Sequence, residues 1–214
     1  PVIIIADLLG VPKADLERFK HWSDIQVTAM GAEDPSEFMA EQMAFMAYMQ
    51  EHMLQRREEI SAGREVPDDL LTLIAGARGA DGDFVAESDA LSVLNQLLVG
   101  GNETTTSLMT NAVWRLLEVP SRWQELVANP QLAEAVVEES LRYDPPVLGL
   151  WRNTTRQVEM HGESIPEHCK VLRNYAAANR DAAGFERPEE FDIHRPRKRP
   201  MSVGLGVHFC LGAP

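Results

Sequence analysis

The stretch GLGVHFCLG at residues 204–212 places a single cysteine, Cys210, between glycines, with His208 two residues before it. Glycine permits tight turns and lets the backbone pass close to a flat ligand. A cysteine presented in such a turn is a candidate thiolate ligand for a metal. The plainer interpretation is a glycine-rich turn around a buried, inert cysteine, which is the usual role of an isolated thiol. The motifs that precede this stretch favour the first interpretation.

Length, charge and composition are those of an ordinary globular protein. The 214 residues carry a net charge of −13, which argues against nucleic acid or an anionic membrane as the partner. The longest strongly apolar runs, Val2–Ile5 and Leu97–Val99, are far too short to span a bilayer. Two cysteines do not make a disulfide framework, which fits a reducing compartment. We therefore expect a cytoplasmic protein that binds neither nucleic acid nor membrane.

The pattern of apolar residues over 1–145 predicts a mainly helical region. Residues 14–28 carry apolar side chains three apart, which gives one apolar face. Further helices are expected at 34–62, 67–77, 120–128 and 130–143, several of them with proline or a capping residue at the start. The helix at 34–62 bears a methionine stripe, namely Met39, Met43, Met46, Met49 and Met53. The stripe predicts core packing or, alternatively, a deformable roof over an apolar substrate pocket.

One long helix is expected over 87–117, and its centre breaks the usual rules of helix composition. The segment GGNETT at residues 100–105 combines paired glycines with threonines, which are poor helix formers. Threonine hydroxyls can bond to carbonyls one turn back and bend a helix. A local rule broken at the centre of a long buried helix often marks a functional segment.

Residues 146–214 differ from residues 1–145 in composition and in the elements that they predict. Short β-like segments are expected at 158–161 and 170–173, and residues 180–209 are rich in proline, arginine and aspartate. A long irregular stretch inside a compact domain is usually functional. Four cations precede the cysteine stretch, namely Arg195, Arg197, Lys198 and Arg199. They form either a solvated loop or a docking patch for an acidic electron donor.

Four motifs, in this order along the chain, resemble the cytochrome P450 family in its bacterial soluble form. They are residues 101–104, Glu139-Ser140-Leu141-Arg142, Arg152 and residues 204–212. The resemblance covers essentially the whole chain and implies a mainly α fold with a small β portion. It implies one partial P450-like domain over 1–214, with a helical part at 1–145 and a strand, meander and cysteine-loop part at 146–214. Because no initiator methionine is present and the chain stops four residues past Cys210, we expect this fold to be incomplete at both ends.

The resemblance implies that residues of the late motifs bind haem b. Cys210 is expected to be the axial ligand of the iron, because thiolate ligation pushes electron density onto iron and favours O–O cleavage. Arg152 and His208 resemble the residues that bind the haem propionates, since an arginine fork suits a carboxylate and a histidine can donate to it. Gly204 belongs to the expected cofactor-binding set.

The resemblance implies that residues of the long helix act on the oxygen side of the haem. Glu103 and Thr104 resemble an acid–alcohol pair that relays protons from water to oxygen. Gly101, with Gly100, is expected to leave room for dioxygen beside the helix and close to the cofactor. The alternative is a threonine-rich helix patch, which is common in proteins.

A third pair of residues is expected to be structural. Glu139 and Arg142 stand three apart and can form a charge-assisted pair on one helix face. In the family this pair braces the meander with a third, basic partner, but Glu190 stands at that position here. Arg187 or Arg195 would have to replace it. A second departure is valine at position 203, where the family usually has phenylalanine.

The activity implied by the resemblance is insertion of one atom of dioxygen into an apolar small organic substrate, by hydroxylation or epoxidation. No flavin or nicotinamide fingerprint is present, so the electrons would come from NAD(P)H through a separate reductase and a ferredoxin-type partner. The alternatives are a peroxide-using enzyme, a non-catalytic haem-binding module and an inert fragment. Glu103 and Thr104 disfavour the first two, because neither needs a proton relay. The sequence does not specify the substrate, and we expect the 214 residues alone to be inactive.

Overall fold

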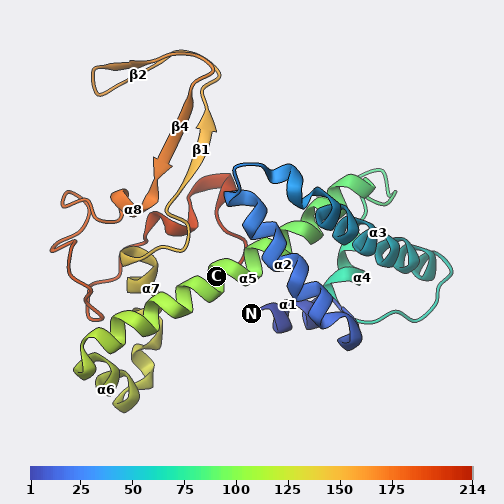
Figure 1. Cartoon of the computed structure of the whole chain (residues 1–214), viewed down its shortest axis with the longest axis horizontal. Coiled ribbons are helices and arrows are strands. Elements are labelled where there is room, and N and C mark those ends of the chain that lie inside the picture. Colours follow the sequence, from blue (N-terminus) through green and yellow to red (C-terminus); the bar gives the residue numbers. More distant parts are fainter. Residues whose placement is uncertain (214) are drawn as a thin grey trace. The chain divides into compact units, whose positions relative to one another are not determined.

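The structure, a computed structural model, describes residues 1–213 and divides into two compact units. The first unit is Pro1–Thr106 and the second begins at Ser107, so the boundary lies inside the longest helix, α5 (Glu87–Glu118) (Figure 1). Each unit has a hydrophobic core of its own.

The first unit is helical. Its helices are α1 (Val2–Leu8), α2 (Leu16–Gly31), α3 (Met39–Ser61), α4 (Leu70–Ala75) and the first part of α5. One-turn 3-10 helices at Lys13–Asp15 and Pro35–Phe38 lead into α2 and α3. Its core packs aromatic side chains of α2 and α3 against leucines of α5, and the rings of Trp22 and Phe45 meet edge to face at 5.6 Å.

The methionine stripe of α3 divides between core and surface. Met49 and Met53 are buried in the core of the first unit, and Met46 packs against it. Met39 and Met43, nearer the start of α3, are 53% and 65% exposed. The expected core packing is therefore confirmed for the C-terminal part of the stripe and is wrong for its N-terminal part.

The second unit combines short helices with two small antiparallel sheets. Its elements after α5 are α6 (Pro120–Ala128), α7 (Ala133–Tyr143), β1 (Gly149–Asn153), β2 (Val158–Met160), β3 (Glu163–Ile165), β4 (Lys170–Asn174) and α8 (Tyr175–Ala178). Its core joins Leu116 of α5 and Val136 of α7 to Phe191 and Ile193, which lie in the irregular segment after α8. This packing explains why a segment without regular elements is ordered: its apolar side chains are buried.

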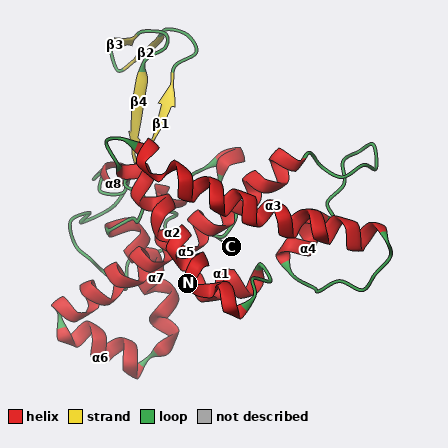
Figure 2. Ribbon diagram, turned by 45° about the vertical axis from the view of Figure 1, so that its right-hand side comes forward, coloured by secondary structure: helices red, strands yellow, loops and turns green. Residues whose placement is uncertain are grey.

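The strands form a ribbon that carries one of the predicted site residues. β1 pairs with β4 from Gly149 opposite Asn174 to Asn153 opposite Lys170, which places Arg152 opposite Val171. The β2–β3 hairpin lies at the far end of this ribbon (Figure 2). Its turn runs through His161 and Gly162, both with positive φ, as tight hairpin turns require.

The expected fold class, mainly α with a small β portion, is confirmed. The long helix ends one residue later than predicted, at Glu118. The helix expected at 130–143 begins as a 3-10 turn, Pro130–Leu132, before α7, and the helix expected at 67–77 is shorter, because Asp69 caps α4 through the Thr72 amide at 2.7 Å. Helix α8 was not predicted. Within residues 1–213, no helix combines the length and the hydropathy that a membrane span requires.

Candidate functional site

The cysteine loop is a compact fold of backbone around Cys210. Two 3-10 turns, Met201–Val203 and Gly206–His208, are joined by Gly204 and Leu205. Gly204 and Gly206 have φ near +70°, a region that favours glycine. The amide of Cys210 donates to the carbonyl of Val203 at 2.9 Å. The glycines recognised in the sequence therefore fold the loop back so that a backbone hydrogen bond holds the cysteine.

The surroundings of Cys210 are open and apolar. Its thiol is free and the residue is exposed, while Val207 and Leu211 are 97% and 87% exposed. Phe209 is anchored beneath the guanidinium of Arg199, whose central carbon lies 3.9 Å from the ring centroid. Exposed apolar side chains in the same loop as a free thiol are what an apolar ligand would cover.

Cys210 is also an isolated donor. Across residues 1–213, no group of three or more histidine, cysteine or acidic side chains is placed to hold a metal ion. A metal bound by this thiolate would therefore need its other ligands from outside the described chain. The second cysteine, Cys169, has no such role: its backbone amide and carbonyl both bond to Thr154 beside the β1–β4 ribbon.

A buried ion network on α7 supports the irregular segment before the loop. Arg142 and Glu139, 2% and 4% exposed, form a bidentate pair with both N–O distances at 2.8 Å. Arg195 completes the network with its Nε 3.1 Å from Glu139. Glu190 points away and pairs with Arg187 on the surface at 2.8 Å. The third partner is thus Arg195, one of the two candidates that the sequence left open.

The two arginines of this network also hold the backbone of the irregular segment. Arg142 donates to the carbonyls of Asn179, Pro188 and Glu190 at 2.8–3.0 Å. Arg195 donates to the carbonyl of Glu190 at 2.8 Å as well. Because a guanidinium presents five donors in a rigid fork, one buried side chain can satisfy several carbonyls that have no helix or strand partner.

Asn179 links this network to the cysteine loop, and no sequence motif marks it. It is fully buried, and its side chain accepts from the amide of Met201 and donates to the Ser202 hydroxyl, both at 2.7 Å. Both partners lie in the first turn of the loop. The residue carries no recognisable motif, because an asparagine before an arginine and an aspartate looks like a surface turn. Only its burial identifies it.

Of the four cations before the loop, Arg195 has a side chain that is only 9% exposed, and the other three are exposed. Arg195 belongs to the buried network and is not available to a partner protein. Arg197 pairs with Glu134 on the surface, Lys198 contacts the carbonyl of Gly184, and Arg199 covers the Phe209 ring. The expected docking patch therefore contains at most Arg197, Lys198 and Arg199.

Arg152 and His208 are both exposed. Arg152 donates to the neighbouring carbonyl of Trp151 at 2.8 Å and forms no ion pair with any acidic side chain in residues 1–213. His208 lies in the cysteine loop, two residues before the thiol. The structure thus places Gly204, His208 and Cys210 on one loop, and Arg152 on strand β1 of the same unit.

The predicted residues of the long helix lie in the first unit. The hydroxyl of Thr104 donates to the carbonyl of Gly100 at 2.7 Å, the back-bond expected of threonine in a helix. Glu103 is half-buried and has no hydrogen-bond or ion-pair partner among the described residues. A Cβ on Gly101 would lie 2.4 Å from Cδ1 of Ile5 in α1, so the absence of a side chain there has a packing reason of its own.

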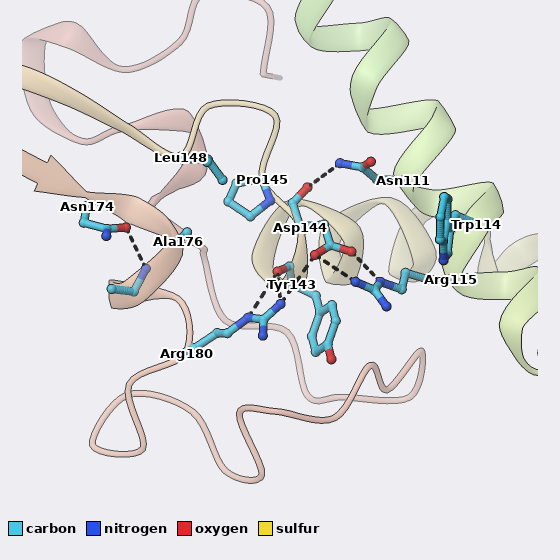
Figure 3. A pocket seen from close by; sticks show the side chains of 11 residues that line it. Asn111, Trp114, Arg115, Tyr143, Asp144, Pro145, Leu148, Asn174, Ala176 and Arg180 are labelled. Carbon is cyan, nitrogen blue, oxygen red and sulfur yellow. Dashed lines mark hydrogen bonds and ion pairs between the residues drawn. The ribbon is translucent and has the colours of Figure 1, made fainter.

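A cavity of about 570 Å³ in the second unit contains none of the predicted site residues (Figure 3). Asp144 at its wall is shared by Arg115 and Arg180, and Arg180 also stacks on the Tyr143 ring at 4.0 Å. The hydrogen bond to Asp144 raises the pKa of Arg115 above its usual value. Arg115 also pairs with Glu118 and Arg180 with Glu189, so each guanidinium beside the cavity has acidic partners within the protein.

Comparison with known proteins identifies the fold. The family described as "Cytochrome P450" matches residues 123–214. Cytochrome P450 YjiB of Bacillus subtilis is 39% identical over 223 residues, and Vitamin D(3) 25-hydroxylase of Pseudonocardia autotrophica is 35% identical over 215. Both matches cover the whole of this chain and 54% and 51% of the relative.

A solved structure agrees with these relatives. Cytochrome P450 CYP109Q5 from Chondromyces apiculatus superposes with a TM-score of 0.88 at 38% identity, over all of this chain and 51% of its own. The chain therefore spans about half the length of the proteins that it matches. Sequence and fold agree along its whole length, and the chain belongs to the cytochrome P450 family.

Proposed function

We propose that this chain provides the thiolate ligand and the proton-delivering residues of a haem-thiolate monooxygenase. The observation that carries the proposal is the cysteine loop, in which a backbone hydrogen bond holds the exposed Cys210 and the apolar Val207 and Leu211 of the same loop are exposed as well. Family membership supports the same assignment.

Haem b fits this loop in two respects. A porphyrin supplies four nitrogen ligands to its iron, so the protein needs to add only an axial donor, and Cys210 is an isolated donor. The macrocycle is flat and apolar, which suits the exposed valine and leucine beside the thiol. When bound, haem would supply the one-electron and dioxygen chemistry that side chains cannot perform.

The remaining cofactor contacts are assigned to exposed polar groups of the second unit. Arg152 and His208 would bind the haem propionates, and Gly204 would let the backbone approach the ring. The unpaired guanidinium of Arg152 supports this role, because a charge without an acidic partner is available for an acidic ligand. The smaller Val203 leaves the thiolate less shielded than a phenylalanine would.

Proton delivery is assigned to Glu103 and Thr104 of α5, with Gly101 beside them. Glu103 is suited to exchange protons with water because it is half-buried and has no partner in residues 1–213. Thr104 would pass the proton on by turning its single O–H away from the carbonyl of Gly100, to which it donates in this structure, while its oxygen accepts the next proton. General acid–base transfer by a positioned side chain typically contributes about 10²–10⁴-fold to a rate.

Electrons are assigned to an external donor. We propose NAD(P)H, a separate reductase and a ferredoxin-type protein that docks at Arg197, Lys198 and Arg199. Their position directly before the cysteine loop supports this, because a cationic patch attracts an acidic partner.

The proposed substrate class is an apolar small organic molecule that is hydroxylated or epoxidised. A relative named Vitamin D(3) 25-hydroxylase supports hydroxylation of an apolar compound. We place the enzyme in the cytoplasm, where a reducing environment keeps Cys169 and Cys210 as free thiols.

The test is the absorption spectrum of the reduced, carbon monoxide-bound full-length enzyme. We expect Cys210→Ser to abolish the signature of thiolate ligation, because the hydroxyl does not replace a thiolate donor. Cys169→Ser is the matched control and should leave the spectrum unchanged, since Cys169 lies beside the β1–β4 ribbon. A thiolate spectrum that survives Cys210→Ser would overturn the proposal.

A further inference from the structure

A buried polar pair joins α2 to α5 within the first unit. Ala90, Leu94 and Leu98 follow one another at every fourth position on the buried face of α5, and the next residue in this row is Asn102. Asn102 is 6% exposed, and its Nδ2 donates to the hydroxyl of Ser23 at 2.6 Å. Ser23 is fully buried on α2, the helix that crosses α5 in Figure 1.

Burial alone does not explain this pair. A leucine at 102 would continue the apolar row, whereas a neutral buried hydrogen bond contributes little net stability and is costly when one partner is lost. What a hydrogen bond adds is direction, because it tolerates only a narrow range of distance and angle. Apolar contacts are non-directional and accept several rotations of a helix about its axis. A single buried polar pair can therefore define one register between two helices.

The pair lies where α5 is least constrained by its own backbone. Gly100 and Gly101 immediately precede Asn102, and glycine is unfavourable in a helix interior. The hydroxyls of Thr104 and Thr106 bond back to the carbonyls of Gly100 and Asn102, at 2.7 and 2.9 Å. Such back-bonds compete with the helical ladder and bend helices. The hydrogen bond from Asn102 to Ser23 of α2 therefore constrains this turn of α5 from outside the helix.

We infer that Asn102 and Ser23 are positioning residues that set the rotation of the α5 turn carrying Glu103 and Thr104. Asn102 directly precedes Glu103, so a rotation of the turn that breaks the Ser23 bond also redirects both side chains. The inference rests on the proposed role of Glu103 and Thr104 in proton delivery.

The experiment compares four variants of the full-length enzyme with the wild type and with Thr104→Ala. Ser23→Ala removes the acceptor, and Ser23→Ala combined with Asn102→Leu makes both positions apolar and leaves no polar group unsatisfied. Ser23→Thr is the conservative variant that keeps a hydroxyl. Gln42→Ala is the matched control, because it removes the partner of another buried α2 side chain, Gln26, at an interface with α3.

The first readout is amide hydrogen exchange, which needs no turnover. We expect exchange at residues 100–106 to accelerate about tenfold in Ser23→Ala, as loss of one neutral hydrogen bond allows. It should stay accelerated in the double apolar variant even though the melting temperature recovers. Gln42→Ala should lower the melting temperature without changing exchange at 100–106, and Ser23→Thr should resemble the wild type.

The second readout is hydrogen peroxide released per NAD(P)H consumed, with a ferredoxin and its reductase as donors and vitamin D3 as the apolar probe. The ratio should rise in Ser23→Ala and in the double variant toward that of Thr104→Ala. If the double variant restores wild-type exchange and a wild-type ratio, the pair only fills space and the inference is overturned. If Thr104→Ala does not change the ratio, the proposed proton delivery fails instead, and the exchange data still decide whether the pair holds the turn.

Discussion

At the scale of single residues, Gly101 and Thr104 each have a structural role as well as a predicted chemical role. Gly101 was predicted from the sequence as part of a site for dioxygen, and the structure gives it a packing role, since a Cβ there would meet Ile5 of α1 at 2.4 Å. Thr104 likewise belongs to a predicted proton relay and makes an ordinary back-bond to Gly100. A residue type chosen for chemistry must also fit its packing, so mutants must separate the two roles.

Gly101→Ala tests the packing role of Gly101 separately from its predicted role beside dioxygen. Alanine gains about 1 kcal/mol of helix propensity, but overpacking against Ile5 costs typically 1–3 kcal/mol, so we expect net destabilisation of roughly 1 kcal/mol. Ile5→Ala removes the clashing atoms, and the double variant should be more stable than Ile5→Ala alone. Urea unfolding of the four proteins measures this coupling. Additive effects of the two substitutions would contradict the packing explanation.

At the scale of elements, α7 organises a long segment that has no regular structure. Arg142 and Arg195 donate to backbone carbonyls of the irregular segment, and Glu139 accepts from the amide of Asp192 at 2.8 Å. Asn179 connects that segment to the first turn of the cysteine loop. The loop is thereby held by side chains rather than by a sheet. This arrangement allows an ordered loop to expose its thiol, because no strand partner has to cover it.

Arg195→Ala tests this support. It leaves the buried carboxylate of Glu139 with one cation instead of two, and loss of a partner from a buried pair typically costs about 3–5 kcal/mol. Arg187→Ala is the matched control, because Arg187 is 56% exposed and exposed pairs contribute about 0–1 kcal/mol. The free energy of unfolding measured in urea and the amount of haem retained should both fall in Arg195→Ala. Both should stay near the wild-type values in Arg187→Ala. Equal losses in both would show that Arg195 is not the third partner.

At the scale of the whole molecule, charge is distributed unevenly. The chain has a net charge of −13, yet three exposed cations, Arg197, Lys198 and Arg199, stand together just before the cysteine loop. A local cationic patch on an acidic protein can guide an acidic partner to one place, because repulsion disfavours other approaches.

The proposed docking predicts a salt-dependent reaction. We expect the rate of electron transfer from a ferredoxin-type donor to fall by roughly tenfold between about 0.05 and 0.5 M salt, since exposed charges are screened. Lys198→Glu should lower the low-salt rate, whereas Lys20→Glu in the first unit, with the same change in net charge, should not. Stopped-flow mixing at several ionic strengths measures the salt dependence of the rate and the effect of each substitution on it. Equal effects of the two substitutions would exclude local docking.

The sequence by itself determined the class of the fold, the extent of the long helix and the glycine-flanked cysteine. These features depend on local rules, namely helical periodicity, capping and turn chemistry, which act between residues close in the chain. It also predicted the Glu139–Arg142 pair, whose two members stand three residues apart.

Only the tertiary structure decided which distant residues meet. Arg195 and not Arg187 bonds to Glu139, Asn179 reaches the cysteine loop, and Asn102 finds Ser23 across 79 residues of chain. Burial separates these residues from polar side chains that look identical in the sequence. The physical reason is that a buried polar group must find its partner wherever the packing of helices places one, and that placement is not written in the neighbouring residues.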